Sequence, residues 1–525
     1  MIRFYRRCFI LLLLALSVST SFAQANPLRT SPCRFDVPRR IDIDCMTLRV
    51  PENRSDPNTV NIVLSLAILR HPDGNPEPDP IIFLQGGPGG ISLDNLSLTY
   101  PNRFEPLFMT NRDIIVFDQR GIGDSRPSLD CNTYRRAETD LLDFRLDESI
   151  LSKFEIDSYL SDLLISCGEL LSTLHDLEGY NSRENAGDIE AIRQALGYEQ
   201  VNLWGISYGT KLALTAMRDY PNSFRRVVLD SVYPLEANLY TELPINFERS
   251  LSLLFERCQA DRACHQTYPD LESILYTAVD DLNRRPIRFD APNPYNNGVF
   301  EDIVFDGDVL LRTIFQLLYS TDLLARLPQL IYQASERNTD TWSILLGWII
   351  AQRGSIAVGM NYAVQCHEEL AFTQAGEIMS AWDSYPQFES YSATFDNRQE
   401  WTIICEAFNA GQATEYENQP VTSDIPTLIL SGEYDPITPP SWAQQVDDSL
   451  SNSYYVALPN SGHGVSGSVG CGQSIVIEFF SIENISTLDS ACTDDLPMIF
   501  SGTQDGDFNP PRSTYNFGSI AINLP

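Results

Sequence analysis

A serine, an aspartate and a histidine follow three separate apolar segments of this sequence, and together they could carry out nucleophilic catalysis. Ser207 lies in the pattern Gly-Ile-Ser-Tyr-Gly, between the apolar segment 201–204 and a helical pattern that stops at Pro221. A serine on a sharp turn from strand to helix is exposed on strained backbone, as a nucleophile requires. Asp435 and His463 each follow a later apolar segment. In this chain order Ser207 can supply the nucleophile, Asp435 the acid that orients the base, and His463 the general base.

His463 is selected as the base by elimination, because the sequence has only five histidines. The other four lie in a hydrophilic loop, in a helical stretch or beside a cysteine: His71, His175, His265 and His367. His463 alone stands in a glycine-flanked loop directly after a late strand-like segment. We therefore predict that His463 takes the proton of Ser207.

Two other acids compete with Asp435 for the role of orienting the imidazole. Asp230 ends the apolar segment 226–230, and Glu433 precedes Asp435 in the same loop. Asp435 is preferred because Pro436 follows it and because its short spacing from the strand directs it toward the carboxyl edge of the sheet. Asp230 and Glu433 stay open as alternatives.

A glycine-rich loop follows the buried-type strand 81–84, with the sequence Gly86-Gly87-Pro88-Gly89-Gly90. A phosphate-binding loop is disfavoured, because the lysine of a P-loop is absent and the spacing G-x-G-x-x-G is not met. With the serine motif downstream, the loop is better explained as an oxyanion loop, whose backbone N–H groups stabilise developing negative charge. We predict that Gly87 and Tyr208 are the donors, and that the charged turn 118–125 braces this loop rather than capping the sheet edge.

Apolar and helical patterns alternate around these residues, which is typical of an α/β fold with a mostly parallel eight-stranded sheet flanked by helices. Two strands between residues 31 and 70 are expected to form an antiparallel edge. The alternation stops between about residues 235 and 420, where helical stretches and Pro/Asn-rich loops take over. An insertion that leaves from the carboxyl edge of the strands would lie over the active site as a helical cap.

The first 25 residues have the layout of a secretory signal peptide, with three arginines, the apolar run 8–16 and then small residues as far as Ala25. A membrane anchor is the alternative, and the shortness of the apolar run disfavours it. Without Cys8, an even ten cysteines remain, which favours five disulfides in an exported chain. Pairing neighbouring cysteines in order gives five compact loops, and we predict this connectivity.

Composition limits the partners that the chain can have. The formal net charge is -34 at pH 7, which argues against nucleic acid and anionic membrane surfaces as partners. No segment after the N-terminus is apolar enough to span a bilayer, so no membrane partner is expected after signal cleavage. No Cys-x-x-Cys pair lies near clustered histidines, and we expect neither a metal nor an organic cofactor. The sequence leaves the oligomeric state open.

Taken together, these motifs make the chain resemble the exported tripeptidyl-aminopeptidase and prolyl-aminopeptidase branch of the α/β-hydrolases. The resemblance covers most of the mature chain and rests on Gly86-Gly87-Pro88-Gly89, Asp118-Gln119-Arg120-Gly121, Gly205-Ile206-Ser207-Tyr208-Gly209, the Asp435/His463 pair and the tail from Cys471 to Cys492. The family's loops usually begin with histidine where this sequence has Gln85, although glutamine and other residues occur in the tripeptidyl branch. The resemblance implies the α/β-hydrolase fold and a helical cap.

Members of that group hold the free amino group of a peptide on carboxylates of the cap and release residues from the peptide's N-terminus. Here Cys366-His367-Glu368-Glu369 is similar to the branch's cysteine followed two residues later by an acid. The resemblance thus makes Glu368 the candidate ligand of the amine. The alternative is an ordinary solvated carboxylate beside a disulfide.

We therefore expect a secreted or periplasmic serine exopeptidase that acts on short peptides with a free N-terminus. A carboxylesterase acting on small esters and an inactive binding protein on the same fold are the alternatives, and the intact Ser207, Asp435 and His463 speak against the latter. The expected organisation is a signal peptide at 1–25, a first core part at 26–234, a helical cap at 235–420, a second core part at 421–492 and a C-terminal tail at 493–525.

Overall fold

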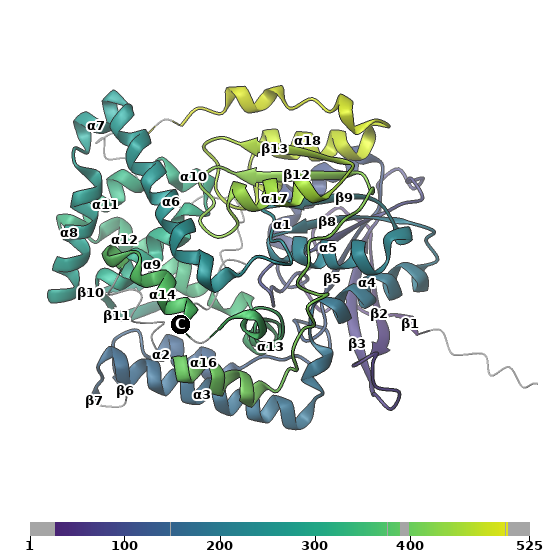
Figure 1. The fold of residues 1–525 in the computed structure, drawn as a ribbon, viewed down its shortest axis with the longest axis horizontal. Helices are drawn as coiled ribbons and strands as arrows, with labels where there is room; N and C mark the ends of the chain where they lie inside the picture. The colour runs from purple at the N-terminus through teal and green to yellow at the C-terminus, as the bar shows by residue number, and fades with distance from the viewer. Residues whose placement is uncertain (1–26, 147–148, 375, 389–397, 499, 502–525) are drawn as a thin grey trace, which may run out of the picture.

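The computed structural model describes residues 27–146, 149–374, 376–388, 398–498 and 500–501. The predicted signal peptide and most of the predicted tail therefore lie outside the described residues. Figure 1 shows a sheet with its helices on one side of the molecule and a large helical region on the other.

A single nine-stranded sheet forms the core. Its strands are β1 (Leu28–Thr30), β2 (Ile43–Pro51), β3 (Asn61–Leu69), β4 (Ile81–Leu84), β5 (Ile114–Asp118), β8 (Val201–Ile206), β9 (Phe224–Asp230), β12 (Thr427–Gly432) and β13 (Ser453–Leu458). Their order is β1-β2-β3-β5-β4-β8-β9-β12-β13. The prediction of eight strands was wrong by one, because β1 has only three residues and is too short to give an apolar pattern.

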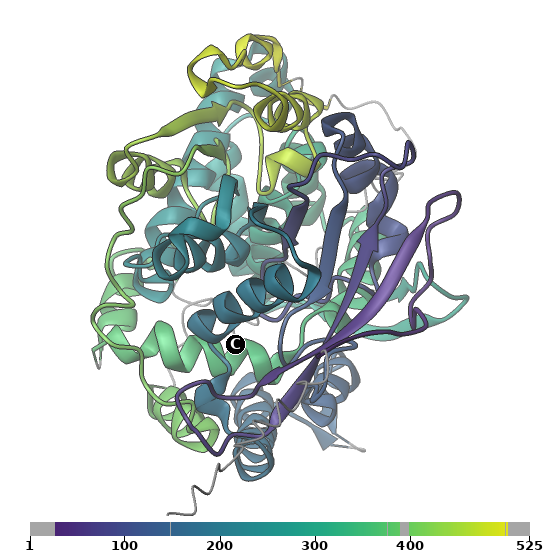
Figure 2. The same ribbon diagram turned by 90° about the vertical axis from the view of Figure 1, so that its right-hand side faces the viewer.

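The sheet changes from antiparallel to parallel at β5. The strands from β1 to β5 pair antiparallel, and those from β5 through β13 pair parallel. The long purple strands β2 and β3 stand along one side of the twisted sheet (Figure 2). The predicted antiparallel edge followed by a mostly parallel sheet is thus confirmed.

Side chains of the central strands alternate between two apolar cores. Ile82 and Leu203 pack with α4 (Ser182–Leu196) and α5 (Tyr208–Asp219) on one face of the sheet. Phe83 and Trp204 pack with α18 (Gly470–Ser481) on the other face. Since helices cover both faces, the strands can be apolar throughout, and their carboxyl ends are the edge that is left for a site.

The cap lies between β9 and β12 and is mainly helical. Its helices are α6 (Leu239–Ala260), α7 (Arg262–Thr267), α8 (Leu271–Arg284), α9 (Gly307–Leu318), α10 (Thr321–Leu324), α11 (Leu327–Ser335), α12 (Asp340–Ala351), α13 (Val358–Glu368), α14 (Glu377–Asp383) and α16 (Arg398–Phe408). A hairpin of β10 (Ile287–Pro292) and β11 (Val299–Phe305) joins α8 to α9.

Two helices that precede the cap in sequence also pack against it. These are α2 (Asn132–Asp140) and α3 (Lys153–Leu174), which are joined through the short strands β6 (Arg145–Leu146) and β7 (Ser149–Ile150). Helix α3 lies along α16 (Figure 1), and Leu164 and Leu171 are buried in the same apolar core as the cap helices. Two further α-helices belong to the core: α1 (Leu96–Thr99) lies between β4 and β5, and α17 (Pro440–Ser449) connects β12 to β13.

Five disulfides join neighbouring cysteines in sequence order, which confirms the predicted connectivity. They are Cys33–Cys45, Cys131–Cys167, Cys258–Cys264, Cys366–Cys405 and Cys471–Cys492. Cys366–Cys405 links α13 to α16 inside the cap. A disulfide set of this size is typical of an extracellular or periplasmic protein.

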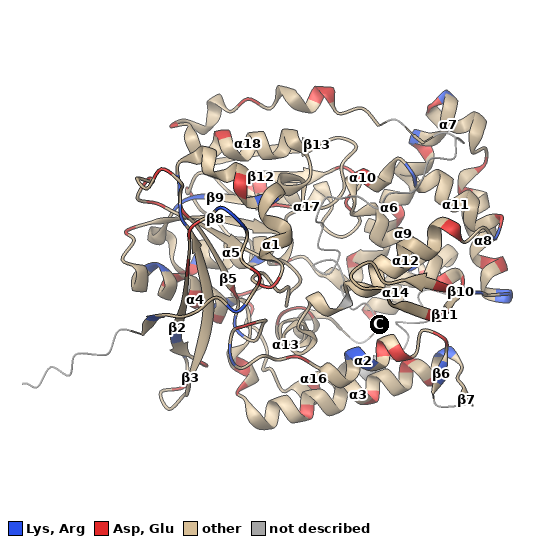
Figure 3. Ribbon diagram, turned by 180° about the vertical axis from the view of Figure 1, so that it is seen from behind, with Lys and Arg blue, Asp and Glu red and all other residues tan. Residues whose placement is uncertain are grey.

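No helix of the described chain is long and apolar enough to cross a membrane. Figure 3 shows Asp and Glu on helices of both the core and the cap, so the excess negative charge is not confined to one segment.

Candidate active site

Ser207 lies on a strained turn between β8 and α5. Its backbone has φ 59° and ψ -129°, a conformation that costs energy for any residue with a side chain. A side chain at Gly205 would overlap the carbonyl group of Gly209, and one at Gly209 would overlap that of Leu84. The two glycines of the motif are therefore required by the close approach of strand and helix, and the predicted strand, turn and helix are all present.

Asp435 and His463 meet at the ends of β12 and β13. The imidazole Nδ1 is 2.7 Å from Asp435 Oδ2, and both side chains are buried, with 0% and 5% of Asp435 and His463 exposed. The hydroxyl of Thr438 donates to the same oxygen at 2.7 Å. The N–H groups of Ile437 and Thr438 donate to Oδ1 at 3.0 Å each. Of the three candidate acids, Asp435 is the one beside the imidazole.

These contacts favour the ionised form of Asp435. Burial by itself raises the pKa of this carboxyl, but His463 and the hydrogen bonds from Thr438 outweigh burial and hold the pKa below its ordinary value. The carboxylate can therefore fix the tautomer of the imidazole and stabilise the imidazolium that forms when His463 takes a proton.

Asp230 has a different task at the end of β9. Its carboxylate accepts hydrogen bonds from the N–H groups of Val465 at 3.0 Å and Ser466 at 2.7 Å, and from the Ser466 hydroxyl. Its carbonyl accepts the N–H of Ser207 at 3.0 Å. Asp230 thus connects the turn at Ser207 between β8 and α5, here called the elbow, to the loop that carries His463. Burial raises its pKa above the ordinary value.

The cap holds the other side of the histidine loop. The backbone N–H of His463 donates to the carbonyl of Tyr319 at 2.9 Å, and the two rings lie 4.8 Å apart. The N–H of Gly462 donates to Thr321 Oγ1 at 3.0 Å. Among the described residues no hydrogen bond joins Ser207 Oγ to His463, so the contact between nucleophile and base stays a prediction.

The glycine-rich loop lies directly against the nucleophile. A β-carbon at Gly86 would be 2.8 Å from the β-carbon of Ser207. Neither the N–H of Gly87 nor that of Tyr208 has a hydrogen-bond acceptor within the described part of the chain. Both groups are therefore available as donors to an oxyanion.

The turn after β5 braces this loop, as the sequence predicts. Gln119 Nε2 donates to the carbonyl of Gln85 at 2.9 Å. Asp118 Oδ1 accepts from the N–H groups of Ser92 at 2.9 Å and Leu93 at 3.0 Å. Complete burial raises the pKa of Asp118 to about 6. The turn therefore fixes both ends of the segment that contains the candidate oxyanion donor.

Glu368 lies in a buried polar cluster with residues from the first turns of α4 and α5. Its carboxylate accepts from Ser182 N at 2.6 Å and from Ser182 Oγ at 2.8 Å, and it lies 3.8 Å from Lys211 Nζ. Lys211 is ion-paired with Glu369. The Ser182 hydroxyl also meets the phenol of Tyr208 at 2.8 Å. Glu368 is thus not a solvated carboxylate, and both of its oxygens are engaged inside the protein.

Sequence reasoning missed several residues of the site. Thr438, three residues after Asp435, is recognisable afterwards as an aspartate-initiated turn, which is a local signal. The clamp made by Asp230 and the packing of Tyr319 on His463 depend on contacts between distant segments and have no such signal. In the described segments, no group of three or more His, Cys, Asp or Glu could hold a metal ion.

Comparison with known proteins identifies the class. Residues 79–285 match the family model described as alpha/beta hydrolase fold, and residues 391–492 match that of TAP-like proteins. The chain belongs to the α/β-hydrolases, in the TAP-like family, and is a hydrolase.

Curated relatives carry peptidase and esterase names. The chain is 23% identical over 445 residues to serine protease Hip1 of Mycobacterium tuberculosis. The aligned region covers 79% of this chain and 81% of the relative. It is 27% identical over 200 residues to tripeptidyl aminopeptidase of Streptomyces lividans, covering 36% and 35%. It is also 27% identical over 255 residues to carboxylesterase B of Mycobacterium tuberculosis, covering 47% and 48%.

Proposed function

We propose that the protein is a secreted or periplasmic serine peptidase that releases short peptides or residues from the free N-terminus of peptides. The observation that carries the proposal is the 2.7 Å contact between His463 Nδ1 and Asp435 Oδ2, at the same sheet edge as the strained Ser207. The names of the relatives, serine protease Hip1 and tripeptidyl aminopeptidase, support peptides as the substrate class.

The reaction is acyl transfer through a covalent intermediate. Ser207 Oγ attacks the scissile carbonyl while His463 takes its proton, and Asp435 offsets the charge of the imidazolium. The N–H groups of Gly87 and Tyr208 stabilise the oxyanion; removing one such donor typically costs about 3 kcal/mol in the transition state. His463 then protonates the leaving amine, and water hydrolyses the acyl-enzyme by the same route.

One assay set tests the proposal. Purified protein is incubated with chromogenic tripeptides, with their N-acetylated forms and with p-nitrophenyl esters, and the serine is labelled with a fluorophosphonate. We expect preference for the free peptides and loss of labelling in Ser207→Ala. Unchanged labelling in that variant would mean that another serine is the nucleophile. No labelling and no turnover of any substrate would favour the inactive binding protein.

A carboxylesterase is the second candidate, because a relative with that name matches almost half of the chain. Hydrolysis of the esters without cleavage of any peptide would favour it and remove the peptidase.

Glu368 is the proposed ligand of the peptide's amine, and its engagement with Ser182 makes a test necessary. If Glu368 binds the amine, Glu368→Gln raises KM for free tripeptides and leaves hydrolysis of N-acetylated peptides or esters unchanged. If its role is to hold Ser182 and the elbow helix, kcat falls for every substrate. Ser182→Ala is the matched control, because it removes the hydroxyl's hydrogen bond to Glu368 and keeps both the backbone N–H donor and the carboxylate.

A further inference from the structure

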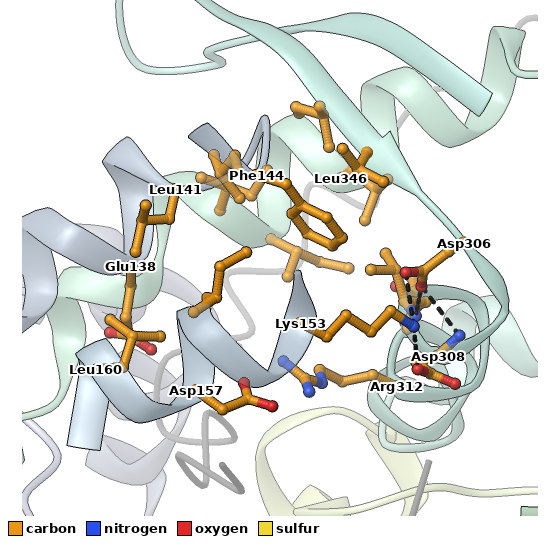
Figure 4. Close-up of a pocket in the computed structure, with 18 of the residues that line it drawn as sticks. Glu138, Leu141, Phe144, Lys153, Asp157, Leu160, Asp306, Asp308, Arg312 and Leu346 are labelled. Atoms are coloured by element: carbon orange, nitrogen blue, oxygen red, sulfur yellow. Dashed lines mark hydrogen bonds and ion pairs between the residues drawn. The ribbon is translucent and has the colours of Figure 1, made fainter. Parts of the chain in front are cut away.

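A cavity of about 160 Å³ lies where α3 packs against the cap, between α3 and α9 (Figure 4). Residues of α2, α3, β11, α9 and α12 line it, and neither Ser207, Asp435, His463 nor Glu368 is among them. The cavity is thus separate from the candidate active site.

One wall of the cavity is apolar. Leucine, isoleucine and phenylalanine side chains form it, among them Leu141, Phe144, Ile156, Leu346 and Ile350. An apolar cavity of about 150 Å³ accepts a molecule the size of benzene. The space therefore fits one aliphatic or aromatic side chain, and it is too small for a whole peptide.

The charged wall contains one group of residues that is already satisfied. Lys153, at the start of α3, is ion-paired with Asp306 at 2.8 Å and with Asp308. Asp306 and Asp308 in turn belong to the N-terminal turn of α9, where Asp306 caps the helix. This group joins the two helices and needs no ligand.

Asp157 and Arg312 differ from that group. Neither side chain has a hydrogen-bond partner among the described residues, and Arg312 Nε is buried. Figure 4 shows the guanidinium of Arg312 extending from α9 toward Asp157 on α3. Burial raises the pKa of Asp157, and the nearby charges of Arg312 and Lys153 only partly offset this effect. Both residues are half-buried. Partly desolvated ionic groups without hydrogen bonds are costly, and a ligand that bonds to both would lower this cost.

We propose that this cavity binds a free apolar α-amino acid, such as leucine or phenylalanine, in its zwitterionic form. The ligand's carboxylate accepts from the Arg312 guanidinium, its ammonium group donates to Asp157, and its side chain lies against Phe144 and Leu346. Both ligand charges are needed, because a fatty acid would leave Asp157 unpaired and a simple amine would leave Arg312 unpaired. A zwitterion is also neutral overall, so it adds no net charge to a cavity in which carboxylates outnumber cations, with Glu138, Asp157, Asp306 and Asp308 against Lys153 and Arg312.

Binding is measured on the mature chain carrying Ser207→Ala, which cannot turn over a ligand, by isothermal titration calorimetry. L-leucine and L-phenylalanine are compared with N-acetyl-L-leucine, which lacks the ammonium group, with L-leucinamide, which lacks the carboxylate, and with glycine, which lacks the apolar side chain. We expect both amino acids to bind and each of the three probes to bind at least tenfold more weakly. No binding of either amino acid would overturn the proposal.

Variants locate the site. Asp157→Asn and Arg312→Gln are each expected to weaken binding of L-leucine at least tenfold. Leu346→Trp, which fills the apolar wall and keeps both charges, should abolish it. Arg285→Gln changes an exposed arginine elsewhere in the cap, paired with Asp281, and should bind as the parent does. Binding that none of the three cavity substitutions weakens would contradict the site, and thermal unfolding of each variant shows that it is folded.

A last comparison separates the cavity from the catalytic site. Active protein whose serine has been blocked by a fluorophosphonate should bind L-leucine as well as Ser207→Ala does. If blocking removes binding, the amino acid occupies the active site and the proposal fails. The binding site does not depend on the proposed peptidase activity, so either can be disproved without the other.

Discussion

Two aspartates at the carboxyl edge of the sheet occupy similar positions and have opposite electrostatics. Asp230 ends β9, Asp435 follows the neighbouring β12, and neither is exposed to solvent. Both accept backbone N–H groups, yet the pKa of Asp230 lies above its ordinary value and that of Asp435 below it. The two pKa values shift in opposite directions because only Asp435 contacts the imidazole of His463, and this ring can carry a positive charge.

At this edge of the sheet, one aspartate orients the imidazole of His463 and another holds the loop that carries it. Asp435 is placed to respond to the charge that His463 gains during the reaction. Asp230 holds the backbone of Val465 and Ser466, and so fixes where the imidazole lies. Burial alone, which the two aspartates share, does not distinguish these roles.

The largest expected effect is that of Asp435→Asn. The amide keeps the shape of the side chain but favours the wrong tautomer of His463, and we expect kcat to fall roughly 10⁴-fold. Steady-state kinetics on the best substrate measures this, with Ser207→Ala as the baseline. A loss below tenfold would mean that another group orients the imidazole.

Asp230→Asn should have a smaller effect on rate and a clear effect on stability. The new NH₂ group would replace one carboxylate oxygen and face the N–H of either Val465 or Ser466. The lost acceptor costs about 1–3 kcal/mol in the free energy of unfolding. A shifted His463 loop should lower kcat about 10- to 100-fold. Urea denaturation and kinetics on the same preparation measure both. A kcat loss as large as that of Asp435→Asn would make Asp230 a direct partner of the base.

The two variants should also respond to pH with opposite signs. The pKa of Asp435 is depressed, so its stabilising contribution is present above pH 3.8 and is lost as pH falls through the folded-state pKa. The pKa of Asp230 is raised, so its contribution is present below pH 3.8 and is lost as pH rises through the folded-state pKa. Lowering the pH should therefore reduce the difference in free energy of unfolding between wild type and Asp435→Asn. It should increase the corresponding difference between wild type and Asp230→Asn. Denaturation curves at several pH values measure the two slopes, and equal signs would contradict the comparison.

The smallest effect is expected for Glu433→Gln, the remaining candidate for the acid. Its carboxylate pairs with Arg257 at 2.7 Å, and the arginine side chain is 51% exposed. Such pairs are worth less than about 1 kcal/mol, and kcat should change by less than twofold. The same kinetic and unfolding measurements apply. A large loss of activity would place Glu433 in the catalytic machinery.

The sequence was sufficient where the determining interactions are local. The turn around Ser207 and the glycine-rich loop after β4 both follow from residues close together in the chain. Short segments carry their own backbone preferences, such as the need for glycine at positions 205 and 209. The choice of His463 and Asp435 followed from their places after successive strands, because parallel strands bring their carboxyl ends to one edge.

Only the tertiary structure decided the partners of groups that lie far apart in sequence. Glu368 bonds to Ser182, and α3 packs against α16, although each pair is separated by more than a hundred residues. Asp157 and Arg312 are as far apart in sequence and line one cavity. The sequence does not distinguish a carboxylate that lies beside an imidazole in the fold from one that lies beside a serine or one that has no hydrogen-bond partner. What it does is set by the charge and hydrogen bonds around it in the fold.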